Sequence, residues 1–180
     1  MKSSAHSLAL SAVMTALTAV LSPLSVPFGA AAFTLQTFAV ALTGYLLAPR
    51  AAFLSVLAYL LLGACGLPVF SMFHGGFGVL LGPTGGFLIG FPVMALLCAL
   101  GQAKPRLRLL AGLAGLLVVY VTGTAQMSCV LQISLRHALL TGAVPFILKD
   151  ILSVLGASAL SRIISRRLHR ILRPEKGRTR

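Results

Sequence analysis

Charge of either sign is scarce in this sequence, and negative charge is almost missing. Only two of the 180 residues are acidic, and charged residues make up 9% of the chain, whereas an ordinary soluble domain has about 25%. Tryptophan is absent and 58% of the residues are hydrophobic. This composition excludes an ordinary soluble domain, and we expect an integral membrane protein whose apolar helices cross the lipid bilayer.

Motifs for catalysis and metal binding are also missing. The sequence has no nucleophile paired with a base, no cluster of metal ligands and no nucleotide-binding motif, and its one candidate, GPTGG at 82–86, lacks the GK[ST] ending of a phosphate loop. Cys65, Cys98 and Cys129 each lie in an apolar run without a CxxC partner, so we interpret them as small buried hydrophobic residues. We therefore expect no catalytic residue, no metal, no cofactor and no enzymatic activity.

The net charge of +13 would be compatible with nucleic-acid binding if the basic residues formed one patch. Most of them instead lie in short segments between apolar runs and in the C-terminal tail. Positive charge at such places sets the orientation of a membrane protein. We expect lipid as a partner and no nucleic acid.

The apolar runs predict an all-α protein with one membrane domain over residues 1–180 and six transmembrane helices. The N-terminal run resembles a signal peptide but lacks a convincing cleavage site, so it is interpreted as the first helix. The expected spans are residues 7–24, 35–48, 51–65, 84–101, 109–132 and 145–165, followed by a basic cytoplasmic tail at 166–180.

The basic residues divide unequally between the two sides of this arrangement. Thirteen of the fifteen would lie on the side that holds both termini, and only Arg136 and Lys149 on the other. The more positive side is cytoplasmic. Both termini are therefore expected in the cytoplasm, and the segments after the first, third and fifth spans are expected at the outer face.

Two of these outer segments carry almost no charge. Residues 22–34 contain none, and their prolines and phenylalanines suggest a lid over a pocket. Residues 63–91 are rich in glycine and phenylalanine, and we expect an ordered loop that lines a small-molecule site, with His74, Gly75 and Thr84 as candidate contacts. His74 could equally be an ordinary interfacial histidine.

The third outer segment holds the only acidic residue outside the C-terminal tail. An ionisable group such as Asp150, at the start of a membrane helix, is a functional candidate by default. A local pair with Lys149 or a helix cap is the alternative, but adjacent helical residues point in different directions, which favours separate contacts for the two side chains. Thr34 and Gln36 could bind a ligand or only fix the loop before the second span.

Small residues form a stripe along the first span, within which Ala12 and Ala16 make an AxxxA pair. Such stripes allow helices to approach closely in lipid. The stripe could pack within the bundle or against another protein.

Several motifs together resemble the BioY family, the biotin-specific substrate-binding subunits (S components) of energy-coupling factor (ECF) transporters. The matching segments, which span nearly the whole chain, are LQT at 35–37, LLLGACGLPVF at 60–70, GGFGVLLGPTGGFLIGF at 75–91 and PFILKDIL at 145–152. The resemblance implies a six-helix S-component bundle in the inner (plasma) membrane of a prokaryote. It further implies biotin binding from the outer face and, as partners, a membrane coupling protein (T component) and two cytoplasmic ATPases.

The resemblance also assigns roles to individual residues. Ala12 and Ala16 match the surface that contacts the coupling protein. Asp150 matches the family's acidic position, which is expected to accept hydrogen bonds from the ureido N–H groups of biotin. Many members carry a lysine where this chain has Ser153, which is kept as a candidate binding residue. Lys149, Arg136 and His74 are the candidates for the biotin carboxylate. An S component for another solute, or an assembly subunit of a membrane complex, is the alternative.

Overall fold

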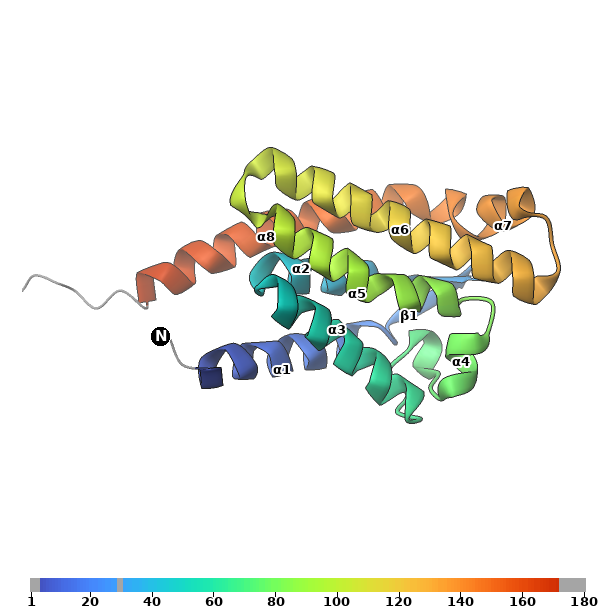
Figure 1. The fold of residues 1–180 in the computed structure, drawn as a ribbon, viewed down its shortest axis with the longest axis horizontal. Helices are drawn as coiled ribbons and strands as arrows, with labels where there is room; N and C mark the ends of the chain where they lie inside the picture. The colour runs from blue at the N-terminus through green and yellow to red at the C-terminus, as the bar shows by residue number, and fades with distance from the viewer. Residues whose placement is uncertain (1–3, 29–30, 172–180) are drawn as a thin grey trace, which may run out of the picture.

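Helices form most of the chain, because its long apolar runs can satisfy their backbone hydrogen bonds internally only as helices when lipid surrounds them. The computed structural model describes residues 4–28 and 31–171. The long helices are α1 (Ser4–Leu21), α2 (Gln36–Leu46), α3 (Pro49–Ala64), α5 (Gly85–Leu100), α6 (Pro105–Leu131) and α8 (Ile147–Ile171). They lie roughly along one direction in an elongated bundle (Figure 1).

Each expected span overlaps one of these six helices, although α1, α3 and α6 begin before the expected span and α8 ends after it. Two helical stretches, Arg106–Leu131 and Leu135–Arg167, are long and apolar enough to cross a bilayer by length and composition alone, whereas Ala5–Leu21, Pro49–Ala64 and Gly85–Leu100 are apolar but shorter. Large apolar side chains cover much of the outside, as is usual where a surface meets lipid. Examples are Leu8, Leu61, Leu110, Leu117, Leu148 and Leu152.

Glycine allows the central helices α5 and α6 to pack closely. A Cβ added to Gly86 would lie 2.3 Å from the carbonyl oxygen of Thr122, and one added to Gly90 would lie 2.8 Å from the Thr122 hydroxyl. Small residues at such contacts are typical of helices that associate in lipid. The α5–α6 pair therefore forms a tight, fixed wall.

The uncharged segment after α1 is not the irregular loop that the sequence predicted, so the fold is mostly helical but not all-α. It forms an antiparallel hairpin of β1 (Ser25–Phe28) and β2 (Ala31–Thr34), in which Ser25 pairs with Thr34 and Val26 with Phe33. Pro27 is tolerated in β1 because a two-stranded hairpin has edge strands only. The predicted role of this segment as a lid is considered below.

The glycine-rich segment interrupts the helices between α3 and α5, as predicted, and it is ordered. It contains the 3₁₀ turn η1 (Ser71–Phe73) and the short helix α4 (Phe77–Leu81). Gly66 and Gly76 have φ of 102° and 97°, a region that side chains with a Cβ rarely adopt. Two short helices that the sequence did not predict thus lie within this segment.

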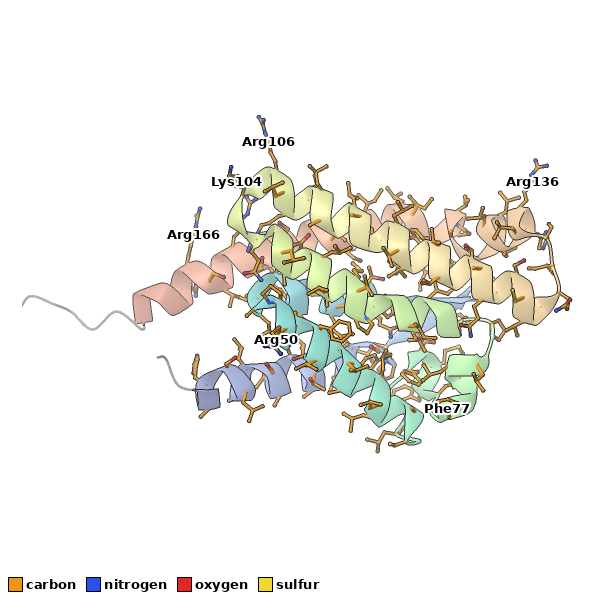
Figure 2. The ribbon with its side chains drawn as sticks, in the orientation of Figure 1. Arg50, Phe77, Lys104, Arg106, Arg136 and Arg166 are labelled. Atoms are coloured by element: carbon orange, nitrogen blue, oxygen red, sulfur yellow. The ribbon has the colours of Figure 1, made fainter. Side chains whose placement is uncertain are left out.

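The remaining elements close the two ends of the bundle. They are η2 (Gly101–Ala103), α7 (Leu135–Gly142) and η3 (Val144–Phe146). Lys104, Arg106 and Arg166 lie at the end where α5 joins α6, and Arg136 lies at the opposite end (Figure 2). The hairpin and α7 lie toward the Arg136 end (Figure 1).

Two of the three cysteines differ from the prediction. Cys98 is buried, but Cys65 and Cys129 are exposed. Cys65 directly follows the last residue of α3, and Cys129 lies in the last turn of α6.

Candidate functional site

A pocket opens at the hairpin end of the bundle, where the three predicted outer segments meet. Its wall takes residues from β2, α2, the glycine-rich segment, α5, α6, α7, η3 and α8. The polar residues of the wall are Thr34, Gln36, Thr37, Ser71, Thr84, Tyr120, Lys149 and Asp150. The three segments that the sequence grouped on one side therefore meet in one pocket, while their place at the outer face stays a prediction.

Asp150 is the acidic residue of the pocket wall. It lies in the first turn of α8, is 5% exposed, and accepts a hydrogen bond at Oδ2 from the Tyr120 hydroxyl at 2.6 Å. Its other oxygen, Oδ1, lies 2.5 Å from the Lys149 ammonium and has no further partner among the described residues. The helix N-terminus also favours this negative charge.

The contact between Lys149 and Asp150 corrects the prediction that the two side chains point to separate partners. Their Cα–Cβ bonds do diverge along the helix, but the long lysine side chain is flexible enough to return its ammonium group to the neighbouring carboxylate. Lys149 also donates to the Thr34 carbonyl oxygen at 3.1 Å. One cation thus binds both the buried acid and the hairpin.

Aromatic and aliphatic side chains make the rest of the wall. Phe33 of β2 and Phe146 of η3 pack with ring centroids 4.7 Å apart, so the hairpin closes against the turn before α8. Apolar walls with a few convergent polar groups are typical of small-molecule sites. The apolar wall residues are Ala32, Val79, Phe87, Leu88, Phe91, Val119 and Phe146.

A buried network anchors Gln36, the first residue of α2. Its side-chain Nε2 donates to the Tyr59 hydroxyl at 2.6 Å, and Tyr59 donates to the Val69 carbonyl oxygen at 3.2 Å. Its backbone N–H donates to Thr34 Oγ1 at 3.2 Å. Gln36 therefore both fixes the chain before α2 and faces the pocket, so the two alternatives left open by the sequence are compatible.

The pocket contains five of the eight residues that the sequence predicted for a ligand. Thr34, Gln36, Thr84, Lys149 and Asp150 line it. Whether they contact a ligand stays a prediction.

The other three predicted residues lie outside the wall. Ser153 lines a separate groove on the outer side of α8 and donates to the Lys149 carbonyl oxygen at 2.9 Å. His74 is exposed, with Nδ1 2.9 Å from the Ser71 carbonyl oxygen. Gly75 packs close to the Leu67 carbonyl. Arg136, a further candidate for a carboxylate, is exposed on α7 and is also absent from the wall.

Tyr120 is the most important wall residue that the sequence did not predict. It lies 30 positions before Asp150, and no local spacing relates the two. The available signal was a tyrosine followed by Thr122, Thr124 and Gln126 within an apolar helix, since polar side chains inside a membrane span often face the protein interior.

The AxxxA pair of α1 lies on the surface. Ala12 and Ala16 are exposed and line a shallow groove that Leu54 and Ala58 of α3 complete. The pair therefore does not pack within the bundle formed by the described residues. A surface role stays a prediction.

Metal ligands do not gather anywhere in residues 4–28 and 31–171: no group of three or more His, Cys, Asp or Glu side chains is close enough to hold an ion. The chemistry that the pocket offers is recognition, by a buried carboxylate, an ammonium group, an amide, hydroxyl groups and aromatic rings.

Known proteins resemble this chain over most of its length. It is 41% identical to the probable biotin transporter BioY of Pyrococcus horikoshii, over 91% of this chain and 96% of the relative. It is 40% identical to biotin transporter BioY2 of Lactococcus lactis, over 89% and 92% of the two chains. Biotin transporter BioY of Thermotoga maritima is 39% identical, over 83% and 89%.

A solved structure has a similar fold. The S component for biotin from an ECF-type ABC transporter superimposes with a TM-score of 0.81 at 26% sequence identity, covering 90% of this chain and 92% of the other. The family model that describes the BioY family matches residues 1–170. The chain belongs to the BioY family.

Proposed function

We propose that this protein captures biotin as the S component of an ECF-type transporter. The observation that carries the proposal is the buried Asp150, paired with Lys149 in the wall of an aromatic pocket. Asp150 is the only acidic residue of the chain outside the basic C-terminal tail. The names of the relatives and of the solved structure support the choice of biotin.

The chemistry of biotin matches the pocket. Its ureido group has two N–H donors and a carbonyl acceptor, its thioether ring is apolar, and its side chain ends in a carboxylate. Asp150 and Gln36 offer acceptors to the ureido N–H groups, and Phe87 and Phe91 offer an apolar surface to the ring. Lys149, a quarter exposed, is the cation for the carboxylate, because neither Arg136 nor His74 lines the pocket.

The proposed arrangement in the membrane has six spans, with both termini in the cytoplasm and the pocket at the outer face of the plasma membrane. The positions of Lys104, Arg106 and Arg166 at one end of the bundle and Arg136 at the other support it (Figure 2), because basic residues concentrate on the cytoplasmic side. The chain would then meet its ligand outside the cell.

Transport would depend on partner proteins: a membrane coupling protein and two cytoplasmic ATPases. The sequence contains no nucleotide-binding motif of its own, so the energy must come from elsewhere if uptake is active. The exposed pair Ala12 and Ala16 offers a smooth helix surface for the coupling protein. No enzymatic activity is proposed.

Ligand-dependent thermal stabilisation of the purified protein tests the proposal. A ligand at about 100 times its Kd stabilises by about 2.7 kcal/mol, which raises the Tm of a chain of this size by about 5–10 °C. We expect this shift with biotin and not with thiamine or riboflavin. A shift with another vitamin alone would indicate an S component for that solute.

Two variants locate the binding site. Asp150→Asn should lose the shift with biotin, and Ser153→Ala, whose side chain lies outside the pocket, should keep it. If no vitamin stabilises the wild-type protein, the chain is better explained as an assembly subunit.

A further inference from the structure

Gln36 is the one amide side chain in the pocket wall, and an amide can present either its oxygen or its NH₂ group to a ligand. Which group faces the pocket decides whether this position selects a hydrogen-bond donor or an acceptor. The surroundings of Gln36 settle its orientation, through a tyrosine that does not itself line the pocket.

The Tyr59 hydroxyl lies between Gln36 and the glycine-rich segment, and it has a single proton. The Val69 carbonyl oxygen, 3.2 Å away, can only accept, so Tyr59 donates to it. The hydroxyl of Ser22, also near Tyr59, donates to the Thr18 carbonyl oxygen at 2.7 Å. With its proton directed to Val69, Tyr59 accepts from Gln36, whose Nε2 lies 2.6 Å from the tyrosine oxygen.

The other end of the amide then faces the pocket. Gln36 Oε1 accepts no hydrogen bond from the part of the chain that the structure describes, yet it is not among the fully buried atoms left without a partner. Because Gln36 lines the pocket, Oε1 is the end of the amide that is left for a ligand. Tyr59 and Gln36 are 0% and 4% exposed, and with the amide reversed Tyr59 would have to donate to Gln36 and leave the Val69 carbonyl without this partner, which is costly.

We infer that Tyr59 is a positioning residue for ligand specificity: through its bond to the Val69 carbonyl it holds Gln36 with Oε1 toward the pocket, so that this position selects a ligand with an N–H donor. The inference rests on the proposed function, and it deepens it by naming which part of the ligand is recognised here. It gives the pocket an acceptor on α2 in addition to the carboxylate of Asp150 on α8.

A double-mutant cycle tests the inference with biotin as the probe. Tyr59→Phe frees the amide to rotate, and we expect biotin to bind about tenfold more weakly, the factor that corresponds to one hydrogen bond. In a Gln36→Leu background, Tyr59→Phe should cause no further loss. Equal losses in both backgrounds would overturn the inference, because Tyr59 would then act on the fold and not through Gln36.

Tyr45→Phe is the matched control. Tyr45 is 1% exposed and donates to the Arg108 carbonyl oxygen at 2.7 Å, so its loss also removes a buried hydroxyl bonded to a backbone carbonyl, but away from the pocket. This variant should lower the Tm and leave the affinity for biotin unchanged. A loss of affinity similar to that of Tyr59→Phe would assign the effect to general destabilisation and contradict the inference.

A second probe keeps the test decisive if Tyr59→Phe does not fold. Biotin methylated on its ureido nitrogens lacks the N–H donors, and the wild-type protein should prefer biotin to it. In Gln36→Leu this preference should fall by about tenfold, and an unchanged preference would refute the assigned orientation. If the wild-type protein binds neither compound, the proposed function fails instead.

Discussion

Removing either member of the Lys149–Asp150 pair should destabilise the protein, but by different amounts. Lys149→Met leaves the carboxylate of Asp150, 5% exposed, with the Tyr120 hydroxyl as its one partner among the described residues. Stranding a buried charge in this way costs about 3–5 kcal/mol. Because the lysine side chain is 25% exposed, water screens the pair, and we expect the lower part of this range or slightly less, about 2–3 kcal/mol.

Asp150→Asn should cost less, about 1 kcal/mol, which is typical of one altered hydrogen bond. The asparagine oxygen can still accept from Tyr120, and Lys149 keeps both its access to water and its bond to the Thr34 carbonyl oxygen. The double variant strands no charge, so its cost should fall below the sum of the two single costs by about 2 kcal/mol.

Thermal or denaturant unfolding in detergent, without biotin, measures these differences. For a chain of this size the Tm should fall by about 4–12 °C for Lys149→Met and by about 2–4 °C for Asp150→Asn. Equal losses for the two variants, or a double variant whose cost equals the sum, would refute the description of the pair as a coupled buried ion pair.

Three further predictions concern packing, topology and assembly. Gly63→Ala should lower stability by about 1–3 kcal/mol in thermal unfolding, because its Cβ would overlap the buried ring of Phe70; an unchanged Tm would contradict the packing. In intact cells, a membrane-impermeant thiol reagent should label Arg136→Cys but not Arg106→Cys, measured against a background variant without the natural cysteines; the reverse pattern would invert the proposed orientation. Ala16→Leu should reduce co-purification of the coupling protein while biotin-dependent stabilisation persists, and unchanged co-purification would exclude this surface as the contact.

The helices could be predicted from the sequence because in lipid an apolar run has almost no alternative to a helix. The bounds of the fourth expected span, 84–101, differ from those of α5 by one residue at each end. The hairpin could not be predicted, because Pro27 argues against a strand and the segment contains no Asn-Gly or Asp-Gly turn.

The pocket could be predicted in outline, because charge placement grouped three distant segments on one side. Individual side-chain contacts were harder to predict, since they depend on side-chain length and on the relative rotation of the helices. The rule that neighbouring helical residues diverge failed for Lys149 because it considers only the direction of Cβ. Tyr120 was missed because its partner Asp150 belongs to another helix.

The hairpin residues whose burial the structure describes are half-buried or exposed. Lys149 binds the second strand of the hairpin through the Thr34 carbonyl, the Met72 N–H donates to Ser25 Oγ of the first strand at 2.8 Å, and Phe33 packs on an aromatic ring. Segments with few buried contacts open locally at low cost. The α5–α6 wall below it leaves no room for a comparable movement, since its glycines already bring the two backbones together. We therefore propose that a ligand enters by displacement of the hairpin and not by separation of the central helices; the lid role predicted from the sequence stays a prediction.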